Sequence, residues 1–242
     1  LGAFLGVSCA CYRGWDRVRR NAKQAEACDA MKLSAGRNKF NYDWWSLVES
    51  YKKYVTTSSA VLEIGSSRPE RTSELGRYCK SLTGLELMPE RTPHDSGNVR
   101  YLTGDWQQLS SIIPPESIDV AVASHVIEHV PDDLKALNEL YKVLKPGGVA
   151  LINTPNRQRL TRRIIEVFTG KRKFPYWEHQ REYVQQDIEN LIARSSFKRY
   201  EIKPLVLGIH GGPVFFYLES VPGLFSKLAN YWEIHLFKSE SK

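Results

Sequence analysis

Apolar residues recur along the chain in short runs that alternate with stretches of helical spacing. Five short runs rich in aliphatic and β-branched residues predict buried strands at 60–64, 82–87, 99–102, 118–123 and 149–153. Apolar positions three or four residues apart predict helices at 41–55, 70–79 and 132–144. Strands that alternate with helices indicate a parallel sheet with helices on both faces.

After residue 153 the alternation becomes less regular. A basic helix is predicted over 157–169 and a further helix over 185–194. Two late strands are expected over 200–207 and 232–237, with a mostly apolar stretch at 211–228 between them. These elements extend the predicted α/β fold towards the end of the chain.

Composition narrows the class of protein. The 242 residues are 42% hydrophobic and 25% charged, which excludes disordered, collagen-like and coiled-coil chains and fits one large α/β domain. No stretch has the ~20 apolar residues that a membrane-spanning helix needs. The four cysteines form no C-x-x-C pair, which argues against zinc, redox and disulfide roles and favours a reducing cytoplasm.

The net charge of +7 is unevenly distributed. Residues 157–173 contain seven basic residues and one acidic residue, and residues 1–40 contain eight basic and three acidic residues. The rest of the chain is mildly acidic, so only these two segments suggest an anionic partner.

The first thirty residues do not match a targeting segment, because no basic region precedes the apolar LGAFLGVSCACY and no cleavage site follows it. Met31 opens a more regular stretch. We expect residues 1–40 to form a disordered or peripheral extension, and residues 1–30 to be peripheral or foreign to the native protein. Peptides from upstream of Met31 in mass spectrometry of the native protein would contradict the second possibility.

Polar residues follow the carboxyl ends of four predicted strands, where open α/β sheets bind ligands. Gly65 lets the backbone turn sharply after the first strand. Glu86 lies 21 residues further on, a spacing at which a carboxylate accepts hydrogen bonds from both hydroxyls of a ribose. The other strand ends carry Asp105 with Trp106, which could pack on a base, and Ser124 with His125. Each feature alone also fits an ordinary turn or a solvated acid.

Taken together, residues 61–189 resemble the class I S-adenosylmethionine-dependent methyltransferases. The most specific segments are SHVIEHVPD and LYKVLKPGGVALINTPNR. They resemble the small-molecule branch near ubiquinone-biosynthesis and glycan-tailoring methyltransferases. The resemblance implies an α/β fold with a doubly wound, mostly parallel seven-stranded sheet whose last strand is antiparallel, and S-adenosyl-L-methionine as cofactor.

The resemblance also assigns cofactor-binding residues. These are Glu63, Gly65 and Ser67 in the first loop, Glu86 and Leu87 at the ribose, Asp105 and Trp106 at the adenine, and Ser124 and His125. Ser67 and Pro69 stand where further glycines are usual in this family. A non-catalytic cofactor-binding module therefore remains an alternative to an enzyme.

Methyl transfer needs mainly alignment of an acceptor lone pair with the activated methyl group, and a base when the acceptor is a hydroxyl. His125, Glu128 and His129 would share one face of a helical turn. We take His129 as the candidate base, although it could serve only to anchor the loop. The same three residues could bind a divalent ion, because quinone-pathway relatives carry two acids and a histidine there, but we assign no metal.

The acceptor pocket is expected to involve an insertion at about 155–185 in a single domain of residues 41–242. Similar family members place such segments over the acceptor, so Arg157, His179 and Arg181 are candidates to meet a phosphate, carboxylate or sugar. Pairing of Arg181 with Glu182 at the surface is the alternative.

The predicted helix at 157–169 alternates apolar residues with arginines. Basic amphipathic helices often lie on anionic membranes, although a core-facing helix explains the same spacing. The expected protein is thus a cytoplasmic enzyme that methylates an oxygen of a small-molecule or lipid-linked acceptor, and a peripheral position at the inner face of the membrane is an alternative to a core-facing helix.

Nucleic-acid methylation is the main rival function, and a pI near 9.2 superficially supports it. The predicted fourth strand ends in Ser-His-Val-Ile, whereas adenine-amino methylation is associated with an Asn-Pro-Pro-aromatic sequence. No cysteine lies where a pyrimidine-attacking nucleophile is needed. The sequence therefore argues against RNA or DNA as the acceptor.

Overall fold

The computed structural model describes residues 42–170, 179–209 and 216–240. Asp43–Lys242 forms one compact unit. The expectations for residues 1–40 lie outside the described residues. No helix within the described ranges combines the length and the apolar content needed to cross a bilayer.

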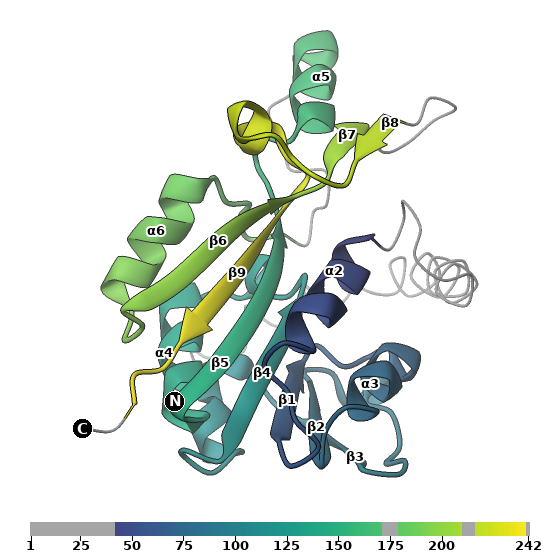
Figure 1. Cartoon of the computed structure of the whole chain (residues 1–242), viewed down its shortest axis with the longest axis vertical. Coiled ribbons are helices and arrows are strands. Elements are labelled where there is room, and N and C mark those ends of the chain that lie inside the picture. The colour runs from purple at the N-terminus through teal and green to yellow at the C-terminus, as the bar shows by residue number, and fades with distance from the viewer. Residues whose placement is uncertain (1–41, 171–178, 210–215, 241–242) are drawn as a thin grey trace, which may run out of the picture. The chain divides into compact units, whose positions relative to one another are not determined.

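The described residues form a seven-stranded sheet in the order β3-β2-β1-β4-β5-β9-β6 (Figure 1). Its strands are β1 (Ala60–Ile64), β2 (Ser81–Glu86), β3 (Val99–Thr103), β4 (Ile118–Ser124), β5 (Leu144–Pro155), β6 (Arg199–Leu205) and β9 (Tyr231–Phe237). Neighbouring strands from β3 to β5 pair in parallel, whereas β9 is antiparallel to both β5 and β6. The predicted doubly wound sheet with an antiparallel last strand is confirmed.

The helices are α2 (Tyr42–Tyr51), α3 (Pro69–Gly76), α4 (Asp133–Val143), α5 (Leu160–Thr169) and α6 (Gln185–Arg194). Short 3-10 turns are η1 (Pro89–Arg91), η2 (Trp106–Ser111), η3 (Ile127–His129) and η4 (Gly223–Leu228). The first predicted helix ends four residues early, at Tyr51. The predicted late strand over 200–207 divides into β6 and β7 (Leu207–Ile209), and β7 pairs with β8 (Phe216–Leu218) in a separate small sheet.

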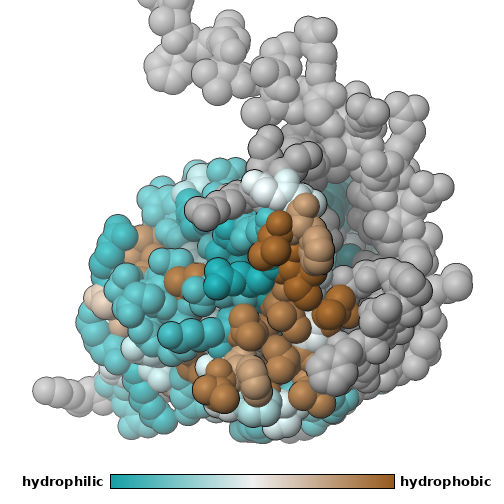
Figure 2. Space-filling view, turned by 90° about the horizontal axis from the view of Figure 1, so that it is seen from above, coloured by the Kyte–Doolittle hydropathy of each residue, from teal (hydrophilic) through white to brown (hydrophobic). Residues whose placement is uncertain are grey.

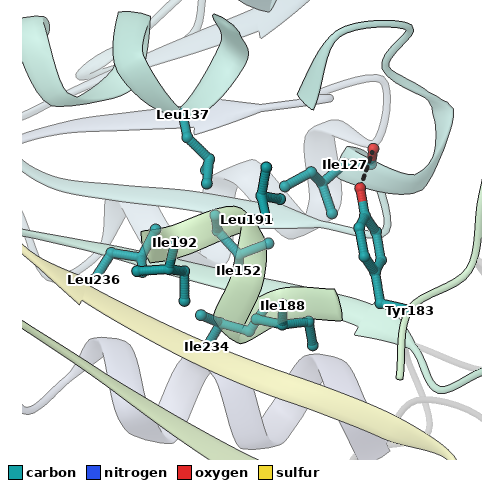
Figure 3. A pocket seen from close by; sticks show the side chains of 9 residues that line it. All are labelled: Ile127, Leu137, Ile152, Tyr183, Ile188, Leu191, Ile192, Ile234 and Leu236. Atoms are coloured by element: carbon teal, nitrogen blue, oxygen red, sulfur yellow. Dashed lines mark hydrogen bonds between the residues drawn. The ribbon is translucent and has the colours of Figure 1, made fainter. Parts of the chain in front are cut away.

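Both faces of the sheet are buried, and β9 shows this most clearly. Trp232, Ile234 and Leu236 belong to the same hydrophobic core as the apolar residues of α4 and α6. Figure 3 shows this part of the core, where apolar side chains from α4, α6, β5 and β9 converge. The gap among them has about the room of one water molecule, so it is a packing defect and not a ligand site.

The intervening β9 residues interact with the α2 region. Ser50 Oγ donates a hydrogen bond to Glu233 Oε1 at 2.5 Å, and the Tyr54 hydroxyl lies 3.1 Å from His235 Nδ1. His235 Nε2 lies 2.8 Å from the same carboxylate oxygen of Glu233. These buried polar contacts link α2 and the following turn to the face of the sheet opposite α4 and α6, and so fix the helix beside the strand ends.

Candidate active site

The carboxyl ends of β1, β4 and β5 meet at one edge of the sheet. In the ladder between β4 and β5, Ser124 lies opposite Asn153, and Glu63 lies opposite Val122 in the ladder between β1 and β4. The chain leaves β1 through Gly65, whose φ is +82°. A Cβ at this position would lie 2.5 Å from Val126 Cγ2, so both the conformation and the space require glycine.

Several buried polar atoms at this edge have no hydrogen-bond partner within the described part of the chain. They are Glu63 Oε2, Ser66 Oγ, Ser124 Oγ and Asn153 Oδ1. Buried polar groups are nearly always satisfied, so a group of unsatisfied ones indicates a place where a polar ligand or water binds. The sequence analysis missed Ser66 and Asn153, although each lies next to or at a predicted strand end.

Glu63 is buried among these atoms. Burial raises the pKa of its carboxyl group from an ordinary 4.5 to about 7, although Thr72 and Arg71 act in the opposite direction. Near neutral pH the protonation of this carboxyl group therefore changes with small changes in its surroundings. Such a shifted pKa is typical of functional sites.

Glu86 ends β2 on the same side of the sheet, and its carboxylate is buried. Its Oε1 accepts a hydrogen bond from the Met88 backbone at 3.3 Å. The next residue, Leu87, is 62% exposed, so an acid and an open apolar surface lie next to each other. Ser67, in the β1–α3 loop, accepts a hydrogen bond from Arg91 at 3.2 Å.

Asp105 and Trp106 differ in whether their side chains are accessible to a ligand. The Asp105 carboxylate caps η2 by accepting a hydrogen bond from the Gln107 backbone at 2.8 Å, and it also binds the Gln107 side chain. Trp106 is only 3% exposed and packs in the hydrophobic core. The prediction that Trp106 packs on a base is therefore wrong in this structure, because the indole points inward.

His125 lies between two carboxylates. Its Nε2 is 2.7 Å from Asp43 Oδ2, and its Nδ1 is 3.3 Å from Glu128 Oε1. Burial alone would lower the pKa of His125, but hydrogen bonds and charges from both acids raise it to about 9. The residue has a φ of +56°, a conformation that non-glycine residues rarely adopt. Its ring nitrogens are thus engaged within the protein, and its backbone N–H donates a hydrogen bond to the Asn153 carbonyl oxygen at 3.0 Å.

His129 is grouped with a different histidine from the one predicted. The expected helical face formed by His125, Glu128 and His129 is absent, because η3 begins only at Ile127. Instead the rings of His129 and His179 lie edge to face with centroids 4.7 Å apart. Glu128, His129 and His179 bring one ligand atom each within 4.8 Å of one another. The geometry of a metal site is therefore available to this set rather than to the predicted trio.

The predicted acceptor-binding arginines lie in ion pairs within the protein. Arg157 Nη2 is 2.7 Å from Glu166 Oε1, and Arg181 Nη1 is 2.9 Å from Asp133 Oδ2. The alternative pairing of Arg181 with Glu182 is wrong. Glu182 is buried and binds Arg159 at 2.8 Å and His179 Nδ1 at 3.1 Å, and these two partners outweigh its burial and hold its pKa at about 2.

Part of the chain is similar to a known protein family. Residues 62–152 match the family model described as a methyltransferase domain. This part of the chain is thus similar to a methyltransferase domain, and the curated relatives that it matches include S-adenosylmethionine-dependent methyltransferases.

Curated relatives are similar to parts of the chain. A probable S-adenosylmethionine-dependent methyltransferase of Mycolicibacterium smegmatis is 49% identical over 98 residues, which cover 40% of this chain and 38% of the relative. The ubiquinone biosynthesis O-methyltransferase of Xylella fastidiosa is 24% identical over 164 residues, or 59% and 64% of the two chains. The matches thus span less than two thirds of either relative.

Solved structures show the same fold. The YcgJ protein of Bacillus subtilis has a TM-score of 0.61 at 16% identity, covering 81% of this chain and 99% of that one. The N-methyltransferase NodS of Bradyrhizobium japonicum, solved with S-adenosyl-L-homocysteine, has a TM-score of 0.53 at 16% identity, covering 85% and 90%. At this identity the similarity concerns the fold alone.

Proposed function

We propose that this protein transfers the methyl group of S-adenosyl-L-methionine to an oxygen of a small-molecule or lipid-linked acceptor. The observation that carries the proposal is the group of unsatisfied buried polar atoms at the carboxyl ends of β1, β4 and β5. Glu63, Ser66 and Ser124 lie in residues 62–152, which match the methyltransferase domain, and Asn153 follows them directly. A polar ligand at this edge would satisfy these atoms.

The residues at this edge fit the nucleoside of the cofactor. Glu86 would accept hydrogen bonds from the ribose hydroxyls, and the open surface of Leu87 would pack against the base. Gly65 lets the backbone approach the ligand, and Glu63 and Ser66 offer polar atoms beside it. Asp105 would meet the adenine edge through lone pairs that Gln107 leaves open, because a carboxylate accepts about four hydrogen bonds.

The bound cofactor supplies a methyl group already activated by its sulfonium. The protein then has to orient the acceptor, exclude water and receive a proton from an acceptor hydroxyl. We assign the proton to the His129 ring, which lies against His179 and next to the buried carboxylate of Glu128. A purely structural role for His129 is the competing explanation.

Transfer from tritiated S-adenosyl-L-methionine into cell extract tests this function. We expect a labelled lipid, quinone or sugar product that carries the tritium in a methyl group bound to oxygen. For His129→Asn we expect kcat to fall at least about a hundredfold with little change in cofactor affinity, because base catalysis contributes about 10²–10⁴-fold. His94→Asn, at an exposed position, is the matched control.

Three results would contradict the proposal. Label in RNA or DNA would show that the acceptor is a nucleic acid. Cofactor binding without transfer to any extract component would indicate a non-catalytic module. A His129→Asn enzyme with unchanged kcat would leave His129 a structural role only.

A further inference from the structure

Helix α5 turns the ion pair of Arg162 and Glu166 towards the protein and several apolar side chains towards the outside. Arg162 is buried, and its Nε lies 3.1 Å from Glu166 Oε1, the oxygen that also binds Arg157. In contrast, Val167 is 81% exposed and Phe168 is 85% exposed. A core-facing helix would show the opposite arrangement, so that interpretation of the sequence pattern is wrong.

Other apolar side chains are exposed near α5. Both α5 and η4 contact β7, and β7 pairs with β8, so these elements lie together at one end of Asp43–Lys242 (Figure 1). In η4, Leu224 is 89% exposed. We call the following set the apolar end face: Ile165, Val167, Phe168, Leu218, Leu224 and Phe225. Figure 2 views the molecule from this end and shows hydrophobic side chains gathered beside hydrophilic ones.

Exposed cations flank the apolar end face, together with one exposed acid, Glu219, next to Leu218. Arg163 on α5 and Lys227 on η4 are exposed, and Lys171, Arg172 and Lys173 follow α5 directly in the sequence. The one acidic residue of α5 is Glu166, which two arginines already neutralise, and η4 contains no acid. The exposed charges of α5 and η4 are thus positive, and an anionic surface would complement them.

We propose that the apolar end face docks on a lipid bilayer that contains anionic lipids. Phe168 and Leu224 enter the boundary between headgroups and acyl chains, and Arg163 and Lys227 meet lipid phosphates. Exposed apolar side chains flanked by cations are the combination that binds proteins to such interfaces.

The docking surface is connected to the candidate active site. Strand β5 carries Asn153 at the site and leads through a short segment into α5. Docking would therefore hold the carboxyl edge of the sheet near the membrane. If the proposed function holds, this position suits an acceptor that resides in the bilayer.

Vesicle co-sedimentation of the full chain, without cofactor, tests the docking. We expect binding to vesicles containing phosphatidylglycerol and much weaker binding to phosphatidylcholine alone. A triple variant, Val167→Ser, Phe168→Ser and Leu224→Ser, should lower the bound fraction about fivefold or more, because it removes the inserted apolar area. Arg163→Gln with Lys227→Gln should lower binding to the anionic vesicles and leave weak binding to phosphatidylcholine unchanged.

Tyr200→Ser is the control, because Tyr200 is an aromatic residue on β6 that is 41% exposed and lies outside the apolar end face. It should bind vesicles like the wild type, and melting curves should show that all variants fold. The proposal would be overturned if the wild-type protein did not bind anionic vesicles, or if the triple variant bound as well as the wild type. A wild-type dimer in light scattering that becomes monomeric in the triple variant would also overturn it, since the face would then join two copies. Because no cofactor is present, these outcomes are independent of methyl transfer.

Discussion

At the scale of single residues, Glu63 places a carboxyl group inside the protein at the end of β1. Its pKa is raised to about 7, mainly by burial. An acid whose pKa is raised on folding destabilises the folded state once it ionises. This cost is absent below about pH 4.5, the ordinary pKa of the group, and grows as the pH rises to about 7.

Replacing Glu63 by Gln should therefore stabilise the cofactor-free protein in a pH-dependent way. Near pH 8 we expect the free energy of unfolding to rise by about 3 kcal/mol, whereas near pH 4.5 it should hardly change. Urea unfolding at both pH values measures the difference. Glu70→Gln, at an exposed position on α3, should change stability by less than about 0.5 kcal/mol. Equal effects of Glu63→Gln at both pH values would show that the buried carboxyl does not titrate as described.

His125 has the opposite pH dependence. Its pKa is raised from 6.5 to about 9 because Asp43 and Glu128 outweigh the effect of burial. The stabilisation from its charge is complete below about pH 6.5 and is lost as the pH rises through about 9.

His125→Gln should leave two buried carboxylates without their cation. Near pH 6 we expect a loss of about 3–5 kcal/mol, and the gap to the wild type should narrow near pH 9.5, where the wild-type ring is neutral too. Thermal and urea unfolding of His94→Gln, an exposed histidine, provides the comparison. A loss for His125→Gln that stayed constant across this pH range would contradict an imidazolium between the two acids.

At the scale of elements, local sequence patterns predicted what local interactions determine. The strand over 60–64 and the helix over 185–194 have the predicted bounds, because their apolar spacing and flanking residues leave one solution. The helix around α4 was also predicted, and its start depends on Asp132, whose Oδ1 accepts a hydrogen bond from the Lys135 backbone at 2.9 Å.

Removing this cap tests how much the local interaction contributes. Asp132→Ala should destabilise the protein by about 1 kcal/mol, whereas Asp132→Asn, which keeps the acceptor oxygen, should cost only a few tenths. Chemical denaturation of both variants measures these two losses of stability. If the two substitutions cost the same, the helix start depends on the charge or on other contacts rather than on the cap.

The parts of the site that the sequence analysis missed depend on long-range contacts or on side-chain direction. His125 meets Asp43 across 82 residues, and no local pattern links them. His129 likewise contacts His179, which is distant from it in the sequence. The tryptophan after Asp105 fits a ligand platform or a core residue equally well in sequence, and only its burial in the hydrophobic core of the folded protein distinguishes the two. For α5, the amphipathic spacing identified the helix but not which side faces outward.

At the scale of the whole molecule, the doubly wound sheet brings four strand ends to one edge, as the alternation of elements predicted. The buried polar atoms of β1, β4 and β5 and the carboxylate of Glu86 can serve one ligand only because this topology places their strands side by side. A ligand that binds only the folded protein also stabilises it, by about 2.7 kcal/mol at a concentration a hundred times its Kd. Binding and stability at this edge are therefore linked.

The most direct test of this account is the calorimetric Kd of S-adenosyl-L-homocysteine for Glu86→Gln, with Glu90→Gln, an exposed acid four residues away, as the matched control. Replacing the carboxylate weakens two charge-assisted hydrogen bonds to the ribose. We therefore expect Glu86→Gln to bind at least about tenfold more weakly and Glu90→Gln to bind like the wild type. Unchanged affinity in Glu86→Gln would contradict a nucleoside bound at the carboxyl edge of the sheet.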